Sequence, residues 1–225
     1  MPGRNSSTAA PTPAPPRLPP TTRPAASPDH DLEDEARFRQ LSFDDLDLGG
    51  QSGHGVEFEQ CRFTRTPLAG AILERATFTD CQVRGSDWAN LRATRSALLR
   101  VDIEAVRLTG LHWVDGSLRD VSLRECRMDL AVFRFSSFKD VSFVDCNLTR
   151  ADFTQADLRG ARFQGCDLSG AQFAQADCRD TRFTRCELGG IGSVTSLRGA
   201  TISSHDLTAL SHTLATALGI TIADA

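Results

Sequence analysis

Residues 151–175 read ADFTQ-ADLRG-ARFQG-CDLSG-AQFAQ, five consecutive blocks in which every third residue is Phe or Leu. The same frame runs back to Ala36 and forward to Gly190 without an insertion or deletion. Of the 31 third positions from Phe38 to Leu188, 12 are Phe, 11 are Leu and only Gly53 lacks an apolar side chain. A period of five fits neither a helix nor a simple strand. The pattern therefore predicts a chain that turns at every block.

The first position of each block is the second regular feature. It holds Ala, Cys, Ser, Thr, Val or Gly in 26 of the 31 blocks. One bulky and one small apolar residue per block predict a coil in which the third position fills the axis. The first position then lies where the backbone turns close to that axis.

Blocks ADFTQ, ADLRG and CDLSG resemble the A(D/N)LxX motif of the pentapeptide-repeat proteins, and the resemblance covers residues 36 to about 202. It implies an all-β fold, a right-handed quadrilateral parallel β-helix with four blocks per coil. The length of the repeat then gives about eight coils stacked as a solenoid. We expect the residues that differ by multiples of 20 to line one inner face: Phe58, Phe78, Phe138 and Leu158.

The chain divides into three segments. Residues 1–28 are dominated by Pro, Ala, Ser and Thr, and with the acidic residues that follow they predict a disordered tail over 1–35. Residues 36–202 form the β-helix. Residues 203–225 are expected to form a C-terminal helix cap, because four leucines recur there at helical spacing: Leu207, Leu210, Leu214 and Leu218.

Flanking residues support that helix. Ser203 or Ser204 could cap its start and Gly219 could end it. Its apolar stripe would seal the last coil. The resemblance implies an alternative, in which the same stripe seals a homodimer through the C-terminal ends.

Charge is distributed unevenly along the chain. The net charge is −4, yet residues 29–60 carry ten acids against two Arg, and residues 36–200 carry 22 acids and 22 bases. A neutral body argues against direct nucleic-acid binding, which needs a basic surface. The acidic end supplies the candidate partner-binding residues: Asp44, Asp45, Asp47, Glu57 and Glu59.

The sequence lacks any motif for catalysis, metal binding or cofactor binding. Six of the seven cysteines occupy first positions, and Cys126, Cys146, Cys166 and Cys186 are spaced to stack on one corner. We expect these thiols to act as small buried hydrophobes. Phe135 is the single Phe outside the third position and is a candidate contact residue. We therefore expect a protein that is not an enzyme and holds no metal or cofactor.

The sequence has no apolar run long enough to span a membrane and no signal peptide, so a cytoplasmic protein is expected. The resemblance implies binding to DNA gyrase or topoisomerase IV as a DNA mimic, with protection from quinolones or a natural gyrase poison. Duplex DNA carries about one negative charge per 1.7 Å, so a neutral repeat region predicts only partial mimicry. The alternative is a rigid protein–protein interaction scaffold without a topoisomerase role.

Overall fold

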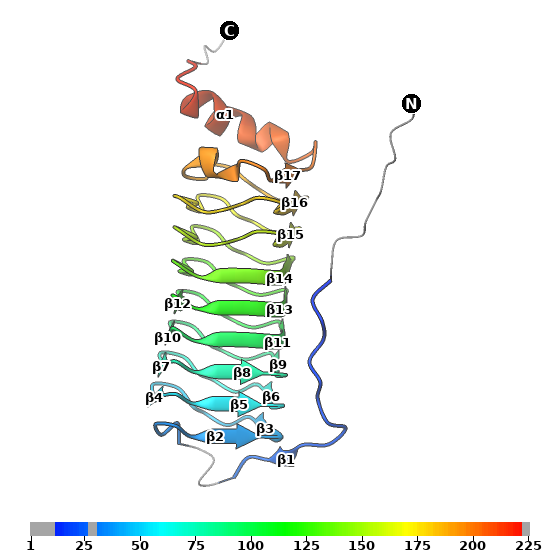
Figure 1. Cartoon of the computed structure of the whole chain (residues 1–225), viewed down its shortest axis with the longest axis vertical. Helices are drawn as coiled ribbons and strands as arrows, with labels where there is room; N and C mark the ends of the chain where they lie inside the picture. The colour runs from blue at the N-terminus through cyan, green and yellow to red at the C-terminus, as the bar shows by residue number, and fades with distance from the viewer. Residues whose placement is uncertain (1–11, 27–30, 222–225) are drawn as a thin grey trace.

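The computed structural model describes residues 12–26 and 31–221. They form a β-solenoid of about nine turns with one short helix at its C-terminal end (Figure 1). Strand partners in the repeats are parallel and 20 residues apart, as Phe58 with Phe78 and Phe143 with Phe163. Because 20 residues are four blocks, the predicted stack of four-block coils is confirmed.

The strands lie on three of the four faces of the coil, which we number from Ala36. The first face holds β2 (Arg37–Arg39), β5 (Glu57–Glu59), β8 (Thr77–Thr79) and the first halves of β11 (Ala97–Glu104), β13 (Ser117–Arg124) and β14 (Ser137–Val144). The second face holds β1 (Arg23–Pro24), β3 (Leu41–Asp44), β6 (Arg62–Thr64), β9 (Gln82–Arg84), the second halves of β11, β13 and β14, β15 (Arg162–Gln164), β16 (Arg182–Thr184) and β17 (Thr201–Ile202). The fourth face holds β4 (Ser52–His54), β7 (Ile72–Glu74), β10 (Arg92–Thr94) and β12 (His112–Val114). The third face is joined by isolated bridges such as that of Arg107 with Arg127.

The fifth position of nearly every block turns the corner. Its residues take left-handed backbone angles, with φ of 55° at both Asp80 and Asn90. Aspartate in the second position supports the turn as expected from its local hydrogen-bonding capacity. Asp167 Oδ1, for example, accepts the N–H of Ser169 at 2.9 Å.

Third-position side chains fill the axis of the solenoid. The four predicted to share an inner face do so, because Phe58, Phe78, Phe138 and Leu158 are each at most 3% exposed. Phenylalanines one coil apart stack face to face, and the rings of Phe143 and Phe163 are 4.8 Å apart and parallel. The core is therefore a set of aromatic columns that run along the axis.

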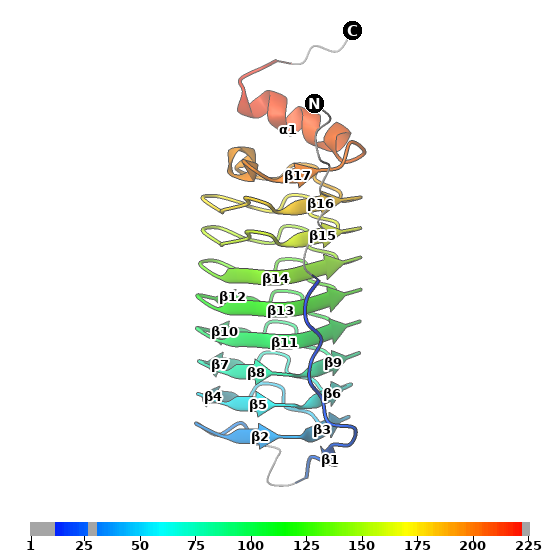
Figure 2. The same ribbon diagram turned by 45° about the vertical axis from the view of Figure 1, so that its right-hand side comes forward.

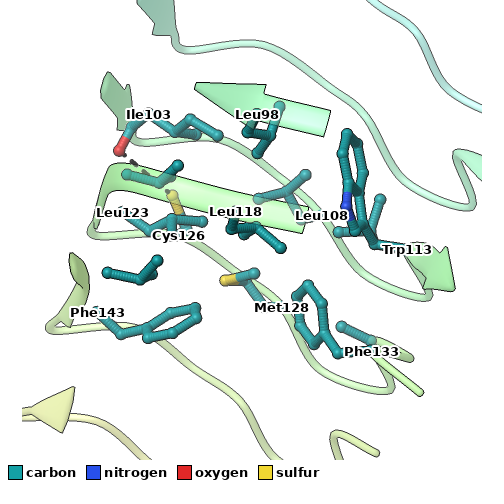
Figure 3. Close-up of a cluster of buried hydrophobic side chains, with 14 of the residues drawn as sticks. Leu98, Ile103, Leu108, Trp113, Leu118, Leu123, Cys126, Met128, Phe133 and Phe143 are labelled. Carbon is teal, nitrogen blue, oxygen red and sulfur yellow. Dashed lines mark hydrogen bonds between the residues drawn. The ribbon is translucent and has the colours of Figure 1, made fainter. Parts of the chain in front are cut away.

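The aromatic columns are interrupted in the middle of the rod, where the core is built from Leu, Ile, Met and Trp side chains (Figure 3). Ala93 is the strand partner of Trp113, so a small residue offsets the large ring as the sequence suggests. Gly116 makes further room, because a Cβ atom there would lie 2.4 Å from Trp113 Nε1. A residual apolar cavity of about 20 Å³ lies among these side chains.

The N-terminal end of the core is closed by Leu32, which is 2% exposed. This residue explains the exceptional third position at Gly53. A Cβ atom on Gly53 would lie 2.4 Å from the carbonyl oxygen of Leu32, so any side chain there would collide with the plug. Gln51 Oε1 accepts the N–H of Leu32 at 2.8 Å and holds the segment in place.

Residues 12–26 differ from the expected disordered tail, because they run along the outside of the solenoid (Figure 2). β1 adds a parallel strand to β3 at the edge of the sheet. Composition predicts disorder from the lack of a core in this segment alone. Here the segment needs no core of its own, since the polar surface of the rod supplies hydrogen-bond partners. Residues 1–11 and 27–30 of the predicted tail lie outside the described residues.

The C-terminal end is covered by a short 3-10 helix, η1 (Val194–Leu197), and by α1 (Leu207–Ala217). Leu210 is buried in the core and Leu214 packs against it, whereas Leu207 and Leu218 are exposed. The helix begins after Asp206 rather than at Ser203 or Ser204. Ser203 is still part of the coil, because its N–H donates to the Phe183 carbonyl at 3.1 Å. Residues 222–225 of the predicted cap lie outside the described residues.

Candidate functional site

The five predicted partner-binding acids lie in the first two coils but on three different faces. Asp44 and Asp45 lie at the end of β3 on the second face, and Asp47 follows on the third face. Glu57 and Glu59 project from β5 on the first face. The structure thus brings them to one end of the rod without gathering them on one surface.

Three of these acids have arginine partners. Arg65 Nη2 lies 2.6 Å from Asp45 Oδ2, Arg37 Nε lies 3.3 Å from Glu57, and Arg39 Nε lies 3.4 Å from Glu59. The hydrogen bond from Arg65 lowers the pKa of Asp45 below its usual value. All three pairs are solvent-exposed and contribute little to stability. They do reduce the negative field that the acids present to a partner.

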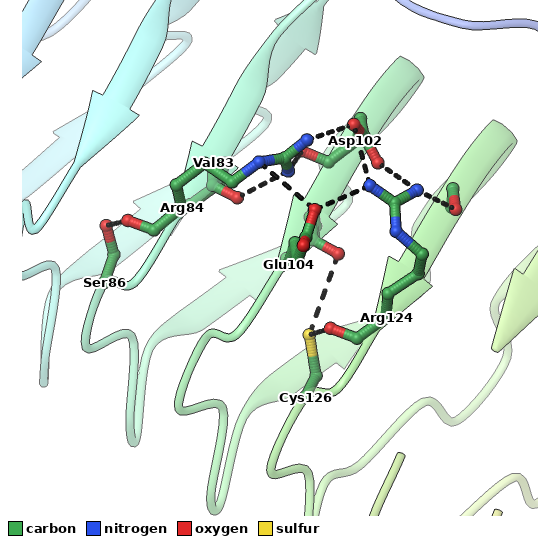
Figure 4. A network of polar contacts seen from close by, with 9 residues as sticks. Val83, Arg84, Ser86, Asp102, Glu104, Arg124 and Cys126 are labelled. Carbon is green, nitrogen blue, oxygen red and sulfur yellow. Dashed lines mark hydrogen bonds and ion pairs between the residues drawn. The ribbon is translucent and has the colours of Figure 1, made fainter. Parts of the chain in front are cut away.

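A second charged cluster lies on the second face and joins three coils (Figure 4). Arg124 reaches Asp102 Oδ1 at 2.8 Å and Glu104 Oε2 at 2.7 Å, and Arg84 also pairs with Asp102. Burial alone would raise the pKa of Asp102, but hydrogen bonds from Arg84 and Arg124 outweigh it and the pKa is lowered. The sequence analysis missed this cluster. Its signal is the alternation of Arg84, Glu104 and Arg124 at 20-residue intervals.

The cysteines are buried and reduced in the described part of the chain. Each first-position thiol lies within hydrogen-bonding distance of the backbone, as Cys146 Sγ does at 3.4 Å from the Val144 carbonyl oxygen. Hydroxyls do the same at other corners, since Ser136 Oγ donates to the Trp113 carbonyl at 2.8 Å. Hydrogen bonding to Cys126 raises the pKa of Cys146 to about 12. Such a thiol stays protonated at neutral pH and is a poor nucleophile.

Exposed apolar side chains flank one strip of the fourth face. Phe135 is 54% exposed and Leu130 is 52% exposed, and they occupy the two corners on either side of residues 131–134. Both have φ of 60°, a conformation that bulky side chains rarely adopt. Phe135 is thus on the surface as predicted, and Leu130 could have been found by the same fifth-position test.

The largest hollow is a cleft of about 650 Å³ between the last coil and α1. His212 is the one titratable residue among those lining it, beside Ser193, Thr195 and Thr216. Among the residues that the structure describes, no group of three or more His, Cys, Asp or Glu could hold a metal ion. The described helices include none that is both long and apolar enough to cross a membrane.

Comparison with known proteins supports the repeat architecture. Residues 116–192 match the family model described as Pentapeptide repeat region. A comparison with curated proteins gives no match.

Two solved structures are similar to this chain. The first is trypsin-treated QnrB1, described as a plasmid-mediated fluoroquinolone resistance protein, with 20% identity over 87% of this chain and 92% of that chain and a TM-score of 0.38. The second is HetL from the cyanobacterium Nostoc sp. strain PCC 7120, described as involved in heterocyst differentiation regulation, with 18% identity over 75% of this chain and 87% of that chain and a TM-score of 0.31. The match over residues 116–192, set within an uninterrupted five-residue coil, identifies the chain as a pentapeptide-repeat protein.

Proposed function

We propose that this protein is a non-catalytic interaction protein that binds a protein partner through the surface of its solenoid. The observation that carries this proposal is the constant register of the coils, with strand partners 20 residues apart from β2 to β16. Outward side chains therefore stand in columns with a spacing of about 4.8 Å. Such a surface is rigid and flat, and it suits recognition of another macromolecule.

The partner that we propose is a type II topoisomerase, either DNA gyrase or topoisomerase IV. The resemblance to the pentapeptide-repeat proteins supports this choice, and QnrB1 is described as a fluoroquinolone resistance protein. The contact would run through the acidic N-terminal coils, which carry Asp44, Asp45, Asp47, Glu57 and Glu59. The protein would act as a partial DNA mimic and protect the enzyme from quinolones or a natural gyrase poison.

A second candidate function is a rigid interaction scaffold without a topoisomerase role. The arginine partners of Asp45, Glu57 and Glu59 favour it, because they neutralise much of the acidic surface. Under this alternative the acidic coils protect the open end of the sheet and keep the protein soluble.

A supercoiling assay with purified gyrase, with and without a quinolone, tests the proposal. We expect the protein to alter supercoiling or relieve quinolone inhibition, and the triple variant Asp44→Asn, Asp45→Asn, Asp47→Asn to lose at least half of that effect. The effect of the natural protein should also weaken as salt rises, because electrostatic attraction is screened over about 8–10 Å. A protein without any effect on gyrase supports the scaffold function instead.

The matched control changes three exposed aspartates elsewhere on the rod: Asp115→Asn, Asp145→Asn and Asp180→Asn. It alters the net charge by the same amount and leaves the first coils intact. Equal effects of the two triple variants would contradict a contact through the acidic coils.

We also propose that the C-terminal cap can join two copies of the chain. After α1 has packed on the last coil, apolar side chains remain on its outer side, with Leu218 74% exposed. Light scattering after gel filtration tests this, and Leu218→Glu should convert a dimer to a monomer. A monomeric natural protein at micromolar concentration would contradict the dimer.

A further inference from the structure

Residues 12–22, which we call the strap, follow the axis of the rod across the border between its first and second faces (Figure 2). The N–H of Ala14 donates to Asp120 Oδ1 at 3.0 Å, and the N–H of Arg17 donates to Asp80 Oδ1 at 2.9 Å. Asp80 and Asp120 are two coils apart, which corresponds to about 9.6 Å. Three residues of a polyproline II helix span about 9.3 Å. One turn of that helix therefore matches two coils of the solenoid.

The side chains of the rod also bind carbonyl groups of the strap. Gln60 Nε2 donates to the Arg17 carbonyl at 2.8 Å, and Arg62 Nη2 donates to the Pro19 carbonyl at 2.9 Å. Arg62 Nη1 reaches Thr22 Oγ1 at 3.2 Å. We call Gln60, Arg62, Asp80 and Asp120 the docking strip. All but one of these contacts bind the strap through its main chain, so they read its conformation more than its side chains.

The proline content of the strap suits this binding. Five of its eleven residues are proline, which has no N–H group to leave unpaired against the polar surface. Proline also holds the chain in the extended conformation before binding, which reduces the entropy lost on docking. The non-proline residues Ala14 and Arg17 stand at the two places where an aspartate accepts an N–H.

The fit is incomplete at one end of the strap. A hollow of about 180 Å³ remains between Pro13–Pro16 and the outward residues Asp102, Ser122 and Arg124. The strap contributes no residue to the continuous hydrophobic core, which begins at Ala25 and Leu32. Its removal therefore leaves the packing of the solenoid intact.

We propose that the docking strip is a binding surface for extended proline-rich segments and that the strap is its resident ligand. The partner is a protein segment in the polyproline II conformation that carries free N–H groups three residues apart. It binds by displacing the strap, since both use the same two aspartates. The strap thereby keeps the strip covered until a segment with better complementarity arrives.

The test uses a chain that lacks residues 1–20 but keeps β1 and Leu32. The probe is a fluorescein-labelled peptide of residues 12–20, TPAPPRLPP, followed by fluorescence polarisation. We expect saturable binding to the shortened chain and at least tenfold weaker binding to the full chain, because a tethered strap competes at a millimolar effective concentration. A shortened chain that is folded by circular dichroism yet fails to bind the peptide at millimolar concentration would overturn the proposal.

Two matched changes show where the peptide binds. In the shortened chain, Arg62→Ala should weaken binding at least fivefold and Arg182→Ala should not, although both arginines open an Arg-Phe-Thr strand on the second face. A peptide with proline at the positions of Ala14 and Arg17 lacks both bonded N–H groups and should not bind. Equal effects of the two arginine changes, or full binding by the proline-substituted peptide, would contradict the docking strip.

A measurement on the full chain covers the case in which the shortened chain fails to fold. Trypsin can cut the strap after Arg17, while Arg23 is protected by the following Pro24. We expect Arg62→Ala to speed cleavage after Arg17 severalfold relative to Arg182→Ala, as followed by mass spectrometry. Equal cleavage rates in these two variants would overturn the docking of the strap.

Discussion

The two ends of the core and its middle follow the same five-residue rule and pack differently. Towards the ends, phenylalanines stack one above another, with ring centroids 4.9 Å apart for Phe43 and Phe63 and 5.0 Å apart for Phe163 and Phe183. In the middle, from Leu98 to Met128, the axis is filled by aliphatic side chains and Trp113, and a small cavity remains. The comparison teaches that the repeat specifies which positions are buried. The density of packing depends on which apolar residue occupies each coil.

The largest effect is expected from a charge placed in an aromatic column. Phe143→Asp would bury a carboxylate between Leu123 and Phe163, with no cation among its strand partners. The penalty of several kcal/mol approaches the whole stability of a typical domain. We expect loss of the cooperative thermal transition by circular dichroism. Phe143→Leu is the control and should keep the fold, and a folded Phe143→Asp protein would show that the columns are dispensable.

The next effect concerns the place where the middle is tightest. Gly116→Ala puts a Cβ atom 2.4 Å from Trp113 Nε1, and we expect a loss of about 1–3 kcal/mol in the free energy of unfolding. Trp113→Leu should relieve part of that loss, so the double variant should be more stable than the sum of the single changes predicts. Urea unfolding measures all three variants. Strict additivity would mean that Gly116 is not required by the indole.

A smaller effect should distinguish the cavity from the filled coils. Leu118 lines the cavity and Leu168 is fully buried one coil beyond Leu148. We expect Leu118→Phe to change the free energy of unfolding by less than about 1 kcal/mol, and Leu168→Phe to lower it by about 1–3 kcal/mol. Urea unfolding of the two variants checks this difference. Equal destabilisation would indicate that the middle is packed as densely as the rest.

The smallest effect is expected at the cysteine corners. Cys146→Ala should lower the free energy of unfolding by about 1–2 kcal/mol through a small cavity. Cys146→Ser should cost less, because the hydroxyl of Ser136 already makes the equivalent bond at another corner. Thermal unfolding compares the two, and metal analysis of the natural protein should find no stoichiometric metal. A serine variant less stable than the alanine variant would contradict the shared role of thiol and hydroxyl.

The candidate site was predicted less completely than the fold. The positions of Asp44, Asp45 and Asp47 near one end follow from the coil number alone. Their distribution over three faces, and the arginine partners of Asp45, Glu57 and Glu59, depend on residues in the next coil. A linear count of charge cannot show this, because residues 20 apart become neighbours only when the coils stack.

The sequence by itself determined the solenoid, its register and its buried columns. The reason is that each five-residue block carries the whole local rule: a small residue, a bulky residue and a turn. Tertiary structure alone decided the course of the strap and the plug at Leu32. Both depend on contacts between segments that share no repeat, such as Arg17 with Asp80 and Leu32 with Gly53. Composition gave the strap no means to fold, and only the polar surface of the finished rod supplies its hydrogen-bond partners.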